Sequence, residues 1–68
     1  MVTESDLFEQ VVVTRADKDV PRGVAGVLMD VFPDFVIIES PPATSGDEPG
    51  IWMVARDAVA RVTDTAAA

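Results

Sequence analysis

Apolar residues gather in four runs along this chain, and a tight break separates two of these runs. The runs at 27–32 and 35–40 are rich in β-branched and aromatic residues, and Pro33-Asp34 lies between them. Proline presets φ for the first central position of a β-turn, and aspartate suits the second. The pattern therefore predicts a β-hairpin whose two strands are joined by a tight turn at Pro33-Asp34.

Three other segments have the composition of strands. Residues 11–14 are four consecutive β-branched residues, 51–56 is a further apolar run, and a short last strand is expected at 60–63. Residues of these types fit the pleated, half-buried surface of a sheet. Five short strands without a long helix predict a small all-β fold.

Two single helical turns complete the expected elements. The first is expected from Ser5, a residue type favoured at N-caps, to Glu9, so that Leu7 and Phe8 cover one end of the core. The second follows the fourth strand and has Asp57 as its cap.

The two long loops differ in character. The loop 15–22 holds three of the five basic residues, Arg15, Lys18 and Arg22, interleaved with acidic ones. It fits either a solvated loop of mixed charge or a recognition loop. The loop 41–50 contains three prolines and two glycines and lacks large apolar residues, so we expect it at the surface.

Glycine marks the entry to the second strand. Gly26 predicts a bulge or a close approach of another backbone, because glycine inside a strand is typical of both. The Gly-x-x-Gly spacing that begins at Gly23 does not predict a phosphate loop, since it precedes no helix and lacks the Gly-Lys-Ser/Thr sequence.

Several short motifs together resemble a family of small bacterial SH3-like domains of unknown function. They are Val-Val-Val-Thr-Arg-Ala-Asp at 11–17, Gly-Val at 26–27, and Arg-Asp-Ala-Val-Ala-Arg-Val at 56–62. The Gly-Val pair is also similar to KOW-type barrels. The sequence at 22–26 departs from the Gly-Asp-x-Gly usual in the family, which leaves the strand register there open.

The resemblance implies a five-stranded SH3-like barrel with a 3-10 turn before the last strand. It covers residues 7–63, between a flexible N-terminus at 1–6 and a disordered tail at 64–68. The family has no assigned chemistry to carry over.

Composition argues against an enzyme. The chain of 68 residues contains neither cysteine nor histidine, so it lacks a thiolate nucleophile, the usual zinc ligands and the commonest general base. Ser40 and Ser45 have no histidine to activate them. The acidic candidates lie at turns or in loops rather than across a cleft: Asp30, Asp34, Glu39, Asp47 and Glu48. We expect no catalytic residue, metal, cofactor or small-molecule substrate.

Charge narrows the range of partners. The net charge is -7, and residues 25–50 carry no basic residue, so binding to nucleic acid is disfavoured. No apolar run is long enough to span a bilayer, and no N-terminal stretch has the pattern of a signal peptide. The absence of cysteine fits a cytoplasmic setting, which we expect.

The apolar surplus is the feature that points to a function. The segments 35–38 and 51–54 do not alternate with polar residues, although a strand directs successive side chains to opposite faces. Both faces of these strands are therefore apolar, and the candidate interface residues are Phe35, Ile37, Ile51, Trp52 and Met53. Trp52 fits either the core or an interface anchor.

These observations predict a non-enzymatic module for protein–protein interaction, as a homodimer or bound to a protein partner through the same patch. Two alternatives stay open. One is an acidic inhibitor or antitoxin-like protein that blocks a basic site, and the other is a nucleic-acid-binding barrel. The salt dependence of binding distinguishes the three possibilities. Apolar docking is nearly insensitive to salt, whereas binding in the other two modes weakens steeply as salt rises.

Overall fold

The computed structural model describes residues 1–42 and 46–65. Within these ranges the chain is a small all-β protein, whose five strands form one antiparallel sheet in the order β4-β3-β2-β1-β5, with two 3-10 turns. In chain order the elements are η1 (Glu4–Asp6), β1 (Gln10–Val13), β2 (Ala25–Val31), β3 (Phe35–Ser40), β4 (Gly50–Ala55), η2 (Arg56–Ala58), β5 (Val59–Arg61) and α1 (Val62–Thr65).

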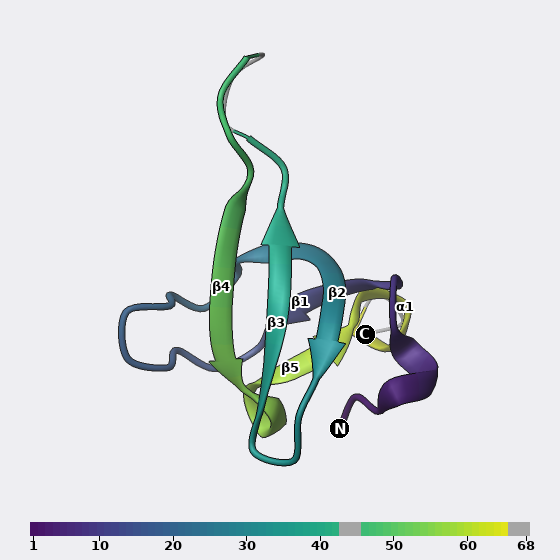
Figure 1. Cartoon of the computed structure of the whole chain (residues 1–68). Helices are drawn as coiled ribbons and strands as arrows, with labels where there is room; N and C mark the ends of the chain where they lie inside the picture. The colour runs from purple at the N-terminus through teal and green to yellow at the C-terminus, as the bar shows by residue number, and fades with distance from the viewer. Residues whose placement is uncertain (43–45, 66–68) are drawn as a thin grey trace.

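The sheet folds over into two layers, and strand β2 belongs to both of them. Its first residues pair with β1, and its later residues pair with β3. The register with β3 shifts between Leu28 and Asp30, which leaves Met29 as the extra residue of a β-bulge. A bulge bends and twists its strand. Figure 1 shows the result, with β3 and β4 in front and β1 and β5 crossing behind them.

The two ends of the strand order, β4 and β5, are joined by η2 and do not pair with each other in the described residues. The sheet is therefore not closed into a barrel by backbone pairing. The predicted five antiparallel strands and the 3-10 turn before the last strand are confirmed.

The core lies between the two layers of the sheet. Alternate residues of the strands fill it, and Val2 from the N-terminal segment joins them. Among the described residues no polar or charged side chain is buried. The buried residues are Val2, Val11, Val13, Val20, Leu28, Val36, Ile38, Val54, Ala58 and Val59.

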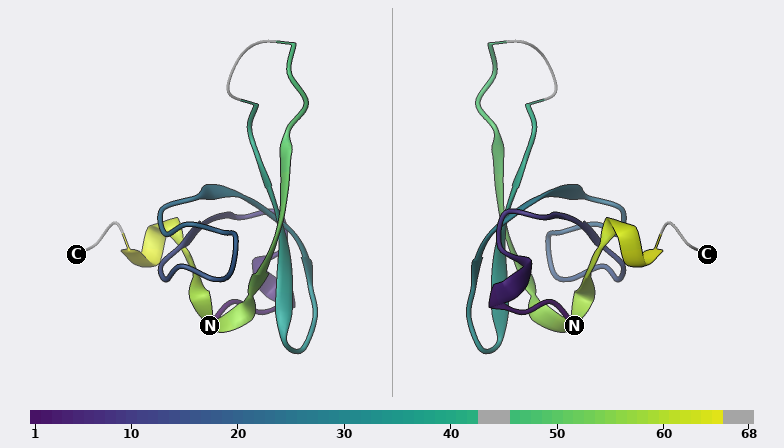
Figure 2. Two further views of the ribbon diagram at one scale, coloured as in Figure 1. Left: turned by 90° about the vertical axis from the view of Figure 1, so that its left-hand side faces the viewer. Right: turned by 90° about the vertical axis from the view of Figure 1, so that its right-hand side faces the viewer.

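The predicted hairpin is present. The backbone N–H of Phe32 donates to the carbonyl of Phe35 at 2.9 Å, which closes a turn with Pro33 and Asp34 at its centre. Figure 2 shows the other hairpin, β3–β4, as an arm that extends beyond the rest of the molecule.

Gly26 is a site of close backbone approach. A β-carbon at this position would collide with the carbonyl oxygen of Glu39 on β3. Of the two roles expected for this glycine, the structure shows the close approach, and the bulge of β2 falls at Met29 instead.

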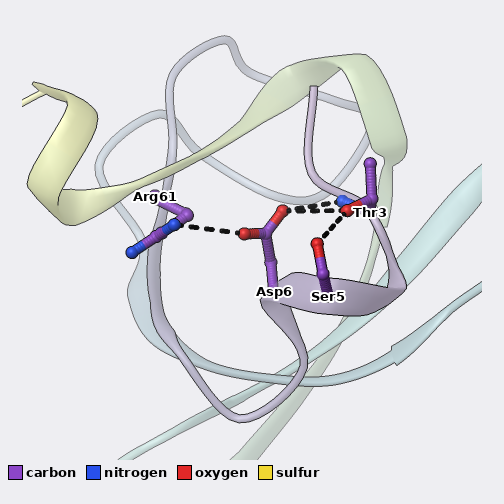
Figure 3. Close-up of polar contacts among 4 residues, drawn as sticks. All are labelled: Thr3, Ser5, Asp6 and Arg61. Atoms are coloured by element: carbon purple, nitrogen blue, oxygen red, sulfur yellow. Dashed lines mark hydrogen bonds and ion pairs between the residues drawn. The ribbon is translucent and has the colours of Figure 1, made fainter.

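The N-terminal turn begins earlier than predicted. Its N-cap is Thr3 rather than Ser5, because the N–H of Thr3 donates to Asp6 Oδ2 at 2.8 Å. The other oxygen of Asp6 accepts a hydrogen bond from Arg61 Nη1 at 3.5 Å, and the Thr3 and Ser5 hydroxyls bond at 2.7 Å (Figure 3). This cluster attaches residues 1–6, the segment predicted to be flexible, to β5.

Of the two side chains predicted to cover the core, only Leu7 does so. Phe8 has φ of 68°, and its side chain is 69% exposed. The N–H of Phe8 donates to the carbonyl of Leu28 at 2.7 Å. This bond ties the backbone of Phe8 to β2 while the residue remains exposed, so the prediction for Phe8 is wrong.

The C-terminal elements also differ from the prediction. Asp57 lies inside η2, after Ala55 as the N-cap, and its carboxylate binds Arg15 at 2.8 Å. The last strand is Val59–Arg61 rather than 60–63, because its pairing with β1 ends at Arg61 opposite Val11. α1 follows, where the end of that strand and the start of the tail were expected. Residues 66–68 of that tail lie outside the described residues.

None of the helices described in 1–42 and 46–65 has the length and apolar character needed to cross a membrane.

Candidate interaction surface

Alternation along β3 and β4 divides their side chains between two faces of the sheet. Val36, Ile38 and Val54 are fully buried on the inner face. Their neighbours in the sequence point the opposite way, since successive strand residues alternate. We call this other side the outer apolar face, and we define it by Phe35, Ile37, Ile51 and Met53.

Strand register places these side chains beside one another. Ile37 is directly opposite Met53, and Glu39 is directly opposite Ile51. Such pairs have β-carbons about 4.5–5.5 Å apart, close enough for side-chain contact. Ile51 and Met53 are each 63% exposed, so most of their apolar surface faces solvent.

An aromatic pair continues the outer apolar face at the β2–β3 turn. The rings of Phe32 and Phe35 are stacked, with centroids 4.6 Å apart and planes inclined by 21°. Phe35 is half-buried, whereas Phe32 is exposed. The apolar surface therefore extends from the open edge of β4 to the turn at Pro33-Asp34.

Trp52 lies on the inner face, away from the four other predicted interface residues. It is opposite the fully buried Ile38 and packs against the core. Its indole Nε1 donates to Ser40 Oγ at 2.9 Å. Of the two roles left open for Trp52, these contacts favour the core.

One hydrogen bond defines which backbone groups of β4 face its open edge. The N–H of Ala55 donates to Asp17 Oδ2 at 2.9 Å, away from β3. In an antiparallel ladder every second residue bonds to the same neighbour. The N–H and C=O groups of Ile51 and Met53 therefore share the orientation of Ala55 and point to the open edge.

Both ends of this edge are closed. At the C-terminal end Asp17 occupies the N–H of Ala55. At the N-terminal end Pro49 has no N–H to offer. The strand between them contains no charged residue and no proline, which are the usual means of protecting an edge. Ile51 and Met53 thus form a short, apolar edge whose backbone is available for pairing.

A shallow depression lies beside this edge. Its volume is about 290 Å³, and Asp17, Asp34, Met53 and Ala55 contribute to its lining. Lys18 is the basic residue of the lining and has φ of 50°. The depression thus combines an apolar strand edge with one positive and two negative side chains.

The residues of the predicted recognition loop do not form one basic patch. Arg15 is paired with Asp57, both largely exposed. Lys18 lines the depression beside β4, whereas Arg22 lines a different one of about 260 Å³ next to β1. The sequence placed these three residues in one loop, but the path of that loop separates them.

The described residues include no group of three or more acidic, histidine or cysteine side chains that could hold a metal ion. The features that sequence reasoning missed are the contact between Asp17 and Ala55 and the depression beside it. Both depend on residues far apart in the chain, so no local pattern signals them.

No family model matches this chain, and neither does any curated protein or solved structure.

Proposed function

We propose that this protein is a non-enzymatic interaction module that self-associates through the outer apolar face and the adjoining edge of β4. The observation that carries the proposal is the exposure of Ile51 and Met53, 63% each, on an uncharged edge strand. Exposed apolar patches of this kind usually mark interaction sites.

We propose further that the fold is SH3-like, as the sequence motifs suggest. Three features support this: the strand order β4-β3-β2-β1-β5, the bulged β2 shared by both layers, and the 3-10 turn between β4 and β5. A small barrel of this kind leaves little room for an enclosed catalytic cleft, which favours docking over chemistry.

Burial of apolar surface supports the proposed association. Burial of apolar surface contributes about 25 cal/mol per Å², so covering Ile51 and Met53 on two copies stabilises a dimer. The net charge of -7 opposes self-association. Salt at physiological strength screens exposed charges beyond about 8 Å, whereas it leaves apolar contact intact.

A second candidate is an acidic module that blocks a basic protein site, in the manner of an inhibitor or antitoxin. Glu39 lies beside Ile51 on the outer face, and residues 23–55 include no basic residue. Nucleic-acid binding has less support, because Arg15 is paired with Asp57 and two carboxylates share the depression with Lys18.

Sedimentation equilibrium over a micromolar concentration range, at low and high salt, tests the proposal. We expect a monomer–dimer equilibrium that persists or strengthens at high salt. Ile51→Lys should weaken the dimer at least tenfold. Thr63→Lys adds the same charge at an exposed position on α1 and should leave the dimer unchanged. A monomer at every concentration and salt would refute self-association and favour the acidic-inhibitor candidate.

A further inference from the structure

We infer that two copies of this chain pair through their β4 edges, antiparallel about a two-fold axis, with Ile51 of one copy opposite Met53 of the other. This inference rests on the proposed self-association and specifies its geometry. Such pairing joins the two five-stranded sheets into one continuous sheet across the dimer axis.

Backbone groups select the register. Two edge strands pair only when residues whose backbone groups face the edge lie opposite each other. On β4 these residues are Ile51, Met53 and Ala55. A two-fold axis at Met53 places Ala55 opposite Ile51, but Asp17 already occupies the N–H of Ala55. An axis at Ile51 places Met53 opposite Pro49, which has no N–H. Only an axis at Trp52 pairs both free residues of both copies.

The side chains fit this register. Ile51 and Met53 of each copy lie on the same face as Met53 and Ile51 of the other, so four apolar side chains cover one another. On the opposite face the two Trp52 side chains are cross-strand neighbours. Since β4 carries no charge, no like charges stand directly opposite each other.

The pairing ends just beyond these residues. In this register Pro49 of the second copy comes beside Ala55, whose N–H is already bonded to Asp17, and proline has no N–H to offer. The paired segment of each copy is therefore limited to Ile51, Trp52 and Met53.

The short edge also explains why the occupant is a second copy rather than a free peptide. Only two residues offer backbone groups, so a flexible peptide gains few hydrogen bonds for the ordering that it must undergo. A second copy presents a preformed strand with the same two free residues.

Cysteine cross-linking tests the register, because the parent chain contains no cysteine. Residues in a hydrogen-bonded antiparallel pair have Cα atoms about 5.5 Å apart, within the disulfide range. In the proposed dimer two Ile51 positions are roughly 8 Å apart, beyond that range. Ile51→Cys and Met53→Cys should both fold, because each side chain is largely exposed; circular dichroism checks this.

An equimolar mixture of Ile51→Cys and Met53→Cys, oxidised with diamide, should give mixed disulfides well above the statistical half of all dimers, as counted by mass spectrometry. A statistical or lower share, with sedimentation still showing a dimer, would overturn the β4 register and leave the proposed function standing. If sedimentation shows that the parent chain is a monomer, both the β4 register and the proposed self-association are overturned.

Discussion

The carboxylate of Asp17 accepts a hydrogen bond from the backbone N–H of Ala55 at 2.9 Å, although the two residues are separated by 38 positions. The loop after β1 is thereby attached to the edge of β4. The same bond leaves Ile51 and Met53 as the edge residues whose backbone is available.

Asp17→Ala should lower the free energy of unfolding by about 1–3 kcal/mol, because a part-buried N–H loses its charged acceptor. Asp19→Ala, an exposed residue of the same loop, should have a much smaller effect. Urea unfolding of both variants checks this. Equal losses would mean that loop composition matters and the bond to Ala55 does not.

Gly26→Ala should destabilise the fold by about 1–3 kcal/mol, since the new β-carbon collides with the Glu39 carbonyl and the backbone must shift. Ala25→Val enlarges the preceding residue, which is exposed, and should change stability little. Thermal unfolding compares the two. A Gly26→Ala variant as stable as the parent would contradict the close approach of β2 and β3.

The bond between Trp52 and Ser40 should contribute about 0.5–1.5 kcal/mol to stability. A double-mutant cycle with Trp52→Phe and Ser40→Ala measures it, because the bond is absent from both single variants. Coupling near this value supports a core role for Trp52. Fully additive effects would indicate that the hydrogen bond does not form in solution.

Phe8→Gly should stabilise the protein or leave it unchanged, because Phe8 has φ of 68° and glycine adopts that conformation without strain. Glu9→Gly is the matched control at a neighbouring exposed position without a positive φ, where glycine should cost about 0.5–1 kcal/mol. Thermal unfolding distinguishes them. A large loss in Phe8→Gly would show that the exposed ring packs in solution.

The sequence by itself determined the five strands and the turn at Pro33-Asp34. β-branched runs and a proline act locally, through the conformations open to each residue and its neighbours. The sequence also indicated the apolar surplus of β3 and β4, and it identified Gly26 as a special position.

Tertiary structure alone decided which face each residue of those strands occupies. Where both faces of a strand are apolar, alternation separates Trp52 from Ile51 and Met53 but does not say which set lies inside. The register with β3 decides it, by placing Trp52 opposite the buried Ile38. Contacts between distant segments likewise decided the backbone position of Phe8 beside Leu28 and the attachment of Asp17 to Ala55.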